Sequence, residues 1–233
     1  MLGKPGIRMA IDAAMAVAFV AVMATALVQE LLHECLGIAL FALVLAHIIV
    51  HRRWFTRMVR GRYDAVRVLQ LAAVLGLLAC IAGQVASSIV LSEYALWWLP
   101  AVPGTWWARR VHMLCSHWAF VLTFAHAGLQ FRTALARMGL NREPERPAAW
   151  ACRIALVAVA CFGAWSFAAL ELPAYLSGQV EFAFVDREAP LALAFAQWAS
   201  VGVLVAGAFH CLESLLRGGG KSEGGKTREG DGR

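Results

Sequence analysis

The chain has 233 residues, of which 61% are hydrophobic and only 15% are charged, and its formal net charge at pH 7 is +6. Soluble globular domains carry about 25% charged residues, so this composition excludes that class. The apolar residues fall in long runs that leave too little chain for a separate soluble catalytic domain. The positive charge requires no nucleic-acid partner, because basic loops beside anionic lipid account for it.

Six apolar segments are each near or above the ~20 residues that a membrane-spanning helix needs. They are 9–28, 33–51, 67–91, 106–131, 150–171 and 190–215. We therefore expect an all-α membrane protein with six transmembrane helices. Residues 1–217 are expected to form one integral membrane domain. The Gly-rich, charged segment 218–233 is expected to be a disordered cytoplasmic tail.

The boundary between the first two segments is the least marked. Residues 9–51 contain no proline and only Gly37, so the turn is placed around Gln29–Glu34 from its polarity. Residues 1–26 also resemble a secretory signal peptide that ends in Ala24-Thr25-Ala26. Because the apolar run continues beyond that site, we expect an uncleaved first helix.

Basic residues indicate the orientation of the chain. If the amino terminus is cytoplasmic, all but three of the 21 Lys and Arg residues lie on the cytoplasmic side, the exceptions being Arg109, Arg110 and Arg187. The positive-inside rule then favours six helices with both termini in the cytoplasm. We expect a multi-pass protein of the bacterial inner membrane.

Two pairs of histidines share one spacing. His33 and His47 are fourteen residues apart, and so are His112 and His126. Fourteen residues of α-helix advance ~21 Å and complete nearly four turns, so both imidazoles of a pair face the same side. The second and fourth expected helices run in the same direction, which places His33 beside His112 near the outer ends and His47 beside His126 near the inner ends. This pattern predicts two bis-histidine haem sites, one above the other.

The chemistry of such sites indicates electron transfer. Two axial imidazoles fill both open positions of a haem iron and leave none for oxygen. The second nitrogen of each ring then needs an acceptor; Glu30, one turn before His33, is a candidate, but the favoured interpretation is that it marks the aqueous end of the helix. No nucleophile–base pair, phosphate-binding loop or zinc motif is visible, which favours an electron-transfer subunit over a self-contained enzyme. The alternative is a haem-free membrane transporter or scaffold whose histidines hydrogen-bond between helices.

Neighbouring residues complete the predicted sites and leave alternatives open. Arg109 and Arg110 lie about one turn before His112 and are expected to pair with the propionates of the outer haem. A simple interfacial anchor is the alternative function for these two arginines. His51 follows His47 on the same helix face, so it is either an interfacial residue or the inner ligand in place of His47.

The remaining histidines and cysteines have less specific expectations. His117 and His210 can hydrogen-bond between helices or serve proton transfer near a quinone. Six cysteines are scattered through the apolar segments, and none forms a C-x-x-C-H sequence, which excludes covalent c-type haem attachment. A thiolate haem ligand stays open as an alternative, although the histidines make it unnecessary.

Two segments carry a family resemblance. Leu32–Phe55, LHECLGIALFALVLAHIIVHRRWF, resembles the HE-x-x-G…H…RRW signature of flavinylation-associated cytochromes (DUF4405), which are similar to cytochrome b561-like proteins. His112–Gln130, HMLCSHWAFVLTFAHAGLQ, resembles the second signature of that family, H…W-x-F…H-x-G. One departure is Gln130, where family members often have a further histidine.

The resemblance, over roughly residues 10–132, implies a b-type dihaem cytochrome with a four-helix haem-binding core at about 9–132. Two extra helices at about 150–216 then follow. It implies that two non-covalent haem b groups are bound by His33, His47, His112 and His126. The implied function is transmembrane electron transfer between a quinone pool or cytoplasmic donor and an extracytoplasmic partner that carries covalent flavin or another redox group. A second alternative is the cytochrome b anchor subunit of a larger oxidoreductase complex.

Overall fold

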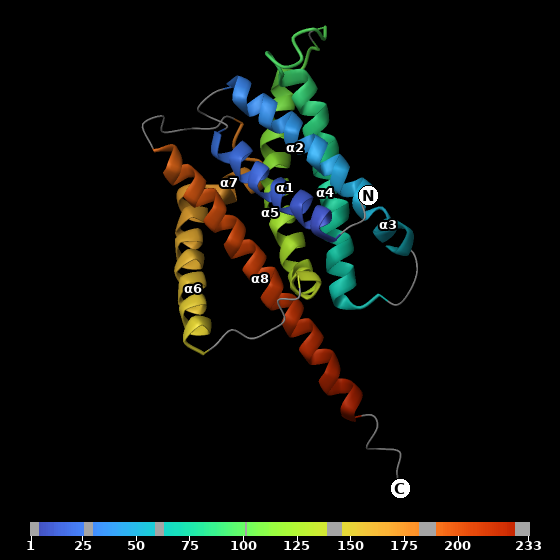
Figure 1. The fold of residues 1–233 in the computed structure, drawn as a ribbon. Helices are drawn as coiled ribbons and strands as arrows, with labels where there is room; N and C mark the ends of the chain where they lie inside the picture. Colours follow the sequence, from blue (N-terminus) through green and yellow to red (C-terminus); the bar gives the residue numbers. More distant parts are fainter. Residues whose placement is uncertain are drawn as a thin grey trace.

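The structure is a computed structural model that describes residues 5–25, 30–58, 63–100, 102–138, 146–181 and 190–226. All regular elements in these ranges are helices, which confirms the all-α class. In chain order they are α1 (Pro5–Thr25), α2 (Glu30–His51), α3 (Arg53–Met58), α4 (Ala65–Leu91), α5 (Thr105–Met138), α6 (Arg146–Ala169), α7 (Leu172–Leu176) and α8 (Leu191–Lys226). Figure 1 shows the long helices packed side by side, with α8 extending beyond the others.

Five helices are long and apolar enough to cross a membrane: α1, α2, α4, α6 and α8. The sixth expected span corresponds to α5, which has 34 residues. Its composition is less apolar because it carries His112, His117 and His126 within the expected span. The six long helices were therefore predicted, and five of them have the composition of a membrane span.

The exposed surface fits a lipid bilayer. Apolar side chains such as Val17, Ile154 and Val157 are more than half exposed. Soluble monomers rarely expose contiguous apolar patches of this kind, whereas hydrocarbon tails accommodate them. The described helices thus have the surface of a multi-pass membrane protein.

The core lies where α1, α5 and α8 meet. Phe120 of α5 is fully buried, and its ring packs edge-on against Phe19 of α1 and Trp198 of α8, at centroid distances of 5.5 and 4.9 Å. Edge-to-face geometry favours the contact of the positive ring edge with the negative ring face. The last helix therefore belongs to the same core as the first and the fifth.

Glycine allows α5 and α8 to approach closely. A Cβ atom added to Gly128 of α5 would lie only 2.2 Å from the carbonyl oxygen of Ala206 in α8. A backbone carbonyl cannot rotate away from such a contact, so the crossing requires glycine at this position. The two helices run in the same direction here, because Phe120 contacts Trp198 and Phe131 contacts His210 further along.

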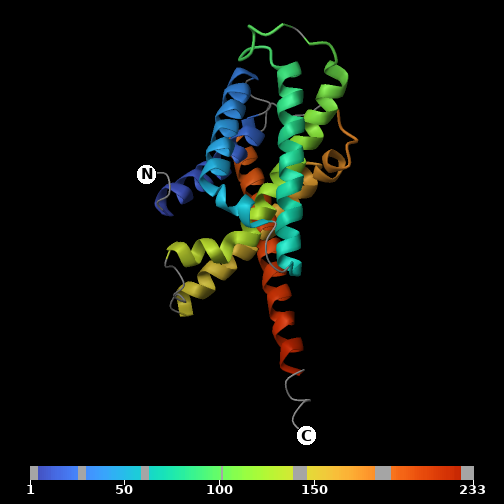
Figure 2. The ribbon, with the colours of Figure 1, turned by 90° about the vertical axis from the view of Figure 1, so that its right-hand side faces the viewer.

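Helix α2 occupies a different position from the core helices. It packs on α1 and on the short α3, whereas α5 packs on α4, α8, α7 and α1. None of its described residues is buried. Figure 2 shows α2 running beside the α4–α5 pair from the same end of the molecule.

Two boundaries differ from the sequence-based expectations. Glu30 begins α2, so the part of the predicted turn from Glu30 to Glu34 is helical, and residues 26–29 lie outside the described residues. At the other end α8 continues to Lys226, into the segment that was expected to be a tail.

Candidate functional site

The outer histidines of α2 and α5 meet across the two helices. The ring centroids of His33 and His112 are 6.2 Å apart, and the ring planes are inclined by 62°. Both side chains are only partly exposed. The structure thus brings together the two residues that were predicted to share the outer site.

His33 is oriented by the end of α1. Its Nδ1 lies 3.2 Å from the backbone carbonyl oxygen of Val22, which can accept a hydrogen bond from the protonated nitrogen. This tautomer leaves Nε2 as the nitrogen that can bind a metal. The acceptor is therefore Val22, and not the candidate Glu30.

Glu30 and Glu34 instead contact the segment that follows α4. The Glu34 carboxylate accepts hydrogen bonds from the backbone amides of Glu93 and Ala95, at 2.9 and 2.6 Å. A hydrogen bond to the Glu30 carboxylate raises the pKa of Tyr94, because the carboxylate holds the phenolic proton. The first turn of α2 is thereby attached to the segment between α4 and α5.

His112 is surrounded by polar groups of α4. The amide nitrogen of Gln84 lies 3.1 Å from both ring nitrogens, and the hydroxyls of Ser87 and Ser88 lie 3.5 Å from Nδ1. The other amide atom, Gln84 Oε1, is buried without a hydrogen-bond partner among the described residues. Rotation of the side-chain amide by 180° would place that oxygen beside the imidazole of His112, where it can accept a hydrogen bond from Nδ1–H.

The inner histidine of α2 is paired with a carboxylate. His47 Nδ1 lies 2.7 Å from Asp12 Oδ1 of α1, and His51 Nε2 lies 3.4 Å from the same oxygen. The rings of His47 and His51 are 4.5 Å apart between centroids. One ligand atom from each of these three residues lies within 4.8 Å of the others, a separation that one metal ion can bridge.

His126 of α5 lies next to this cluster. It interacts electrostatically with His47, His51 and Asp12. Its Nδ1 is buried and has no hydrogen-bond partner among the described residues. A buried imidazole nitrogen without a partner is costly, so this atom indicates a missing ligand or acceptor.

The two arginines predicted near the outer site are exposed. Arg110 Nε forms an ion pair with Glu181 Oε1 at 3.1 Å, and both side chains are about half exposed. Arg109 is one residue away on the same turn of α5. Their position above His112 agrees with either a propionate partner or an interfacial anchor.

The other two histidines lie apart from both sites. His117 is buried and stacks on Tyr175 at 4.1 Å between centroids, while its Nδ1 lies 2.7 Å from the carbonyl of Met113. His210 of α8 contacts Phe131 of α5, with ring centroids 5.1 Å apart. Neither residue contacts the four predicted ligands through its ring.

Sequence reasoning missed Asp12 and Gln84. Asp12 was detectable, because a carboxylate inside an apolar span is costly and therefore indicates a function. Its pairing with His47 was not detectable, since it depends on the antiparallel packing of α1 on α2. Gln84 is a neutral residue in an apolar helix and gave no comparable signal.

No protein-family model, characterised protein or solved structure matches the chain. The resemblance to flavinylation-associated cytochromes therefore rests on the two histidine segments alone. The fold identifies an all-helical chain whose long apolar helices suit a membrane.

Proposed function

We propose that this protein is a membrane cytochrome b that binds two haems between α2 and α5 and transfers electrons across the bilayer. The observation that carries the proposal is the orientation of the α2 histidines. His33 and His47 each direct Nδ1 to an acceptor on α1, the Val22 carbonyl or the Asp12 carboxylate. Histidines that bind metal almost always donate their other ring proton in this way.

The distances at the outer pair suit axial ligation. A bond from a transition metal to an imidazole nitrogen is about 2 Å long, so two imidazoles on opposite sides of one iron have ring centroids roughly 6 Å apart. The 6.2 Å between His33 and His112 fits that requirement. At the inner pair, His47 has in Asp12 the acceptor that a ligating imidazole needs, whereas the buried Nδ1 of His126 has no partner among the described residues.

The packing of α2 also fits a bound cofactor. No described residue of α2 is buried, and α2 packs on α1 and α3 but not closely on α4 or α5. The ring contact of His33 with His112 therefore connects α2 with α5, together with Leu40, which packs against the core around Phe120. A flat prosthetic group between these helices would bury their facing surfaces.

Bis-histidine haem would supply one-electron transfer without a free position for oxygen. His33 and His112 would hold the outer group, and His47 and His126 the inner group. The helix rise of ~21 Å between the two levels suits transfer across most of a bilayer. Arg109 and Arg110 would hold propionates of the outer group.

The location and partners belong to the same proposal. The charge distribution favours the bacterial inner membrane with both termini in the cytoplasm. The resemblance favours an extracytoplasmic partner that carries covalent flavin, and a quinone or cytoplasmic donor on the other side. An anchor subunit of a larger oxidoreductase complex would use the same two haem sites.

A reduced-minus-oxidised visible spectrum of the detergent-purified protein, with a pyridine haemochrome count, tests this proposal. We expect two b haems per chain in the wild type, one in His112→Ala and two in His117→Gln. His117 is a suitable control because it lies on the same helix but stacks on Tyr175. A protein without haem, expressed with ample haem precursor, would leave the transporter or scaffold.

A second candidate function follows from the inner cluster. Asp12, His47 and His51 can together hold one divalent transition metal, because a carboxylate and two imidazoles are ligands that Zn²⁺ accepts. This function competes with the inner haem for His47. Metal analysis distinguishes them: about one Zn²⁺ per chain that is lost in both Asp12→Asn and His51→Gln, with no inner haem, would favour the metal site.

A further inference from the structure

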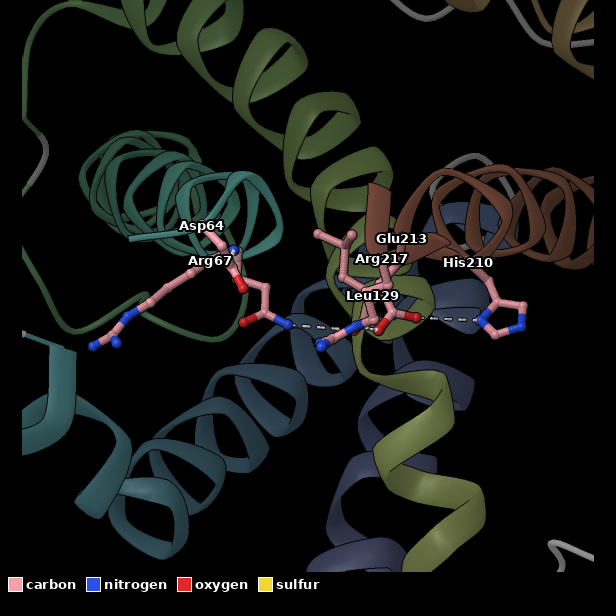
Figure 3. Close-up of polar contacts among 7 residues, drawn as sticks. Asp64, Arg67, Leu129, His210, Glu213 and Arg217 are labelled. Atoms are coloured by element: carbon pink, nitrogen blue, oxygen red, sulfur yellow. Dashed lines mark hydrogen bonds and ion pairs between the residues drawn. The ribbon is translucent and has the colours of Figure 1, made fainter. Parts of the chain in front are cut away.

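A second polar cluster lies on α8, outside the histidine sites. Glu213 has a side chain that is only 3% exposed, and its Oε1 accepts a hydrogen bond from Arg217 Nε at 2.5 Å. Its other oxygen, Oε2, lies 3.8 Å from Nδ1 of His210. Figure 3 shows the His210 ring directed toward Glu213. A buried carboxylate in an apolar helix is costly, so its retention calls for a function.

The atoms that face each other in this cluster are incompletely bonded. Glu213 Oε2 and His210 Nδ1 are both buried, and neither has a hydrogen-bond partner among the described residues. A separation of 3.8 Å is too long for a direct hydrogen bond. The pair therefore presents one acceptor and one potential donor to a third group.

Neighbouring helices add an aromatic ring and an amide group to the surroundings of this cluster. The Phe131 ring of α5 packs edge-on to His210 at 5.1 Å between centroids. Gln70 of α4 donates a hydrogen bond to the carbonyl of Leu129, at 3.4 Å. Three helices thus contribute to one polar region within apolar surroundings.

This region is open to lipid on one side. Phe131, which contacts His210, is 47% exposed, whereas Glu213 is buried. His210 is intermediate, with 32% of its side chain exposed. A ligand that diffuses within the bilayer can therefore reach His210 without passing through water.

The cluster also lies near the inner histidine site. Leu129 and Phe131 follow His126 on α5 within two turns. The close approach of Gly128 to Ala206 holds α8 against this part of α5, one turn before His210. An electron carrier at the inner site would be close enough to exchange electrons with a ligand bound here.

We propose that His210, Glu213 and Arg217 form a binding and proton-exchange site for a lipid-soluble quinone. This inference rests on the proposed electron-transfer function and deepens it. A quinone ring can pack on Phe131, and a carbonyl oxygen can accept a hydrogen bond from the imidazole of His210. Arg217 keeps the buried carboxylate of Glu213 paired.

The reaction balances in either direction. Reduction of a quinone adds two electrons and two protons to its two carbonyl oxygens and yields the hydroquinone. A haem held by His47 and His126 would supply or accept these electrons one at a time. The protons pass through His210 and Glu213 and are exchanged with the cytoplasm on the side of Arg217. Oxidation of a hydroquinone reverses both transfers.

Two variants test the site. Glu213→Gln keeps a hydrogen bond to Arg217 but cannot exchange a proton, and His210→Phe removes the donor while keeping a ring beside Phe131. We expect the rate at which decylubiquinol reduces the haems to fall at least about tenfold in each variant, because each loses a group that exchanges protons with the ligand. Haem content and reduction by dithionite should remain as in the wild type, and His117→Gln should keep the wild-type rate. Wild-type rates in both variants would overturn the proposal.

A binding measurement separates this site from the haem sites. Equilibrium binding of decylubiquinone to detergent-purified protein should survive in His126→Ala, which removes an expected inner ligand, and weaken at least about tenfold in His210→Phe, which loses the donor to the quinone carbonyl. Binding that depends on His210 in a protein without haem would support this site and refute the cytochrome. Two haems with decylubiquinone binding that is equal in wild type, Glu213→Gln and His210→Phe would refute the site and leave the cytochrome intact.

Discussion

The two histidine sites share a helix pair but differ in what surrounds their imidazoles. At the outer site the groups within hydrogen-bonding distance of the imidazoles are neutral, namely the Val22 carbonyl, Gln84, Ser87 and Ser88, and Glu34 acts on His33 only through space. At the inner site Asp12 contacts both His47 and His51. A carboxylate beside a ligating imidazole increases its basicity and stabilises the more positive state of the metal. Two cofactors of one chemical kind would therefore have different reduction potentials, with the lower one at the inner site.

The largest expected effect on the two sites comes from removing the ligand of one of them. His47→Ala should reduce the haem count from two per chain to one, because no other described side chain on that turn of α2 can replace the imidazole without displacing Asp12. The remaining haem should have the spectrum and potential of the outer site. Two haems in His47→Ala would mean that His51 is the inner ligand, and the double variant His47→Ala/His51→Ala would then lose the inner haem.

Packing near the two sites should also respond unequally. Gly128→Ala places a methyl group against the Ala206 carbonyl, at 2.2 Å, so α5 and α8 must separate. We expect a loss of about 3 kcal/mol in the free energy of unfolding. Gly83→Ala, near the outer site, meets the Cys115 Sγ at 2.6 Å, and this side chain can rotate, so about 1 kcal/mol is expected. Unfolding in mixed detergent measures both, and equal losses would contradict the packing described here.

The charge difference can be tested without loss of a ligand. Asp12→Asn keeps a hydrogen bond to His47 but removes the negative charge. The inner haem should then shift to a higher potential by an amount on the order of tens of millivolts, while the outer haem stays unchanged. A redox titration followed by visible absorbance resolves the two components. An equal shift of both components would show that Asp12 acts on the whole bundle and not on one site.

The smallest expected effect concerns the neutral site. Gln84→Leu removes the amide beside His112 but leaves both α5 histidines in place. We expect retention of two haems and a small shift of the outer potential only, because one neutral hydrogen bond is lost. Gln70→Leu is the matched control, since Gln70 lies on the same helix and bonds the Leu129 carbonyl instead. A shift of the inner component in Gln84→Leu would contradict the assignment.

The sequence predicted the helical class and the approximate spans because hydropathy alone determines which segments suit a bilayer. It also predicted that His33 lies beside His112, since equal spacing on parallel helices leaves little freedom. It did not predict that α8 joins the core through Trp198. That contact depends on Gly128 and Ala206 at one crossing, and glycine in an apolar helix has several possible roles. The acceptor for His33 was also missed, because backbone carbonyls such as that of Val22 carry no residue-specific signal.

The exposed position of α2 has a consequence for biogenesis. Helix α2, which does not pack closely on α4 or α5, can join the remaining helices late, after α1, α4, α5 and α8 have assembled. Cofactor loading would then complete the tertiary structure, and resistance to unfolding would increase with cofactor supply. Cells short of haem would accumulate a chain whose second helix is accessible to membrane proteases.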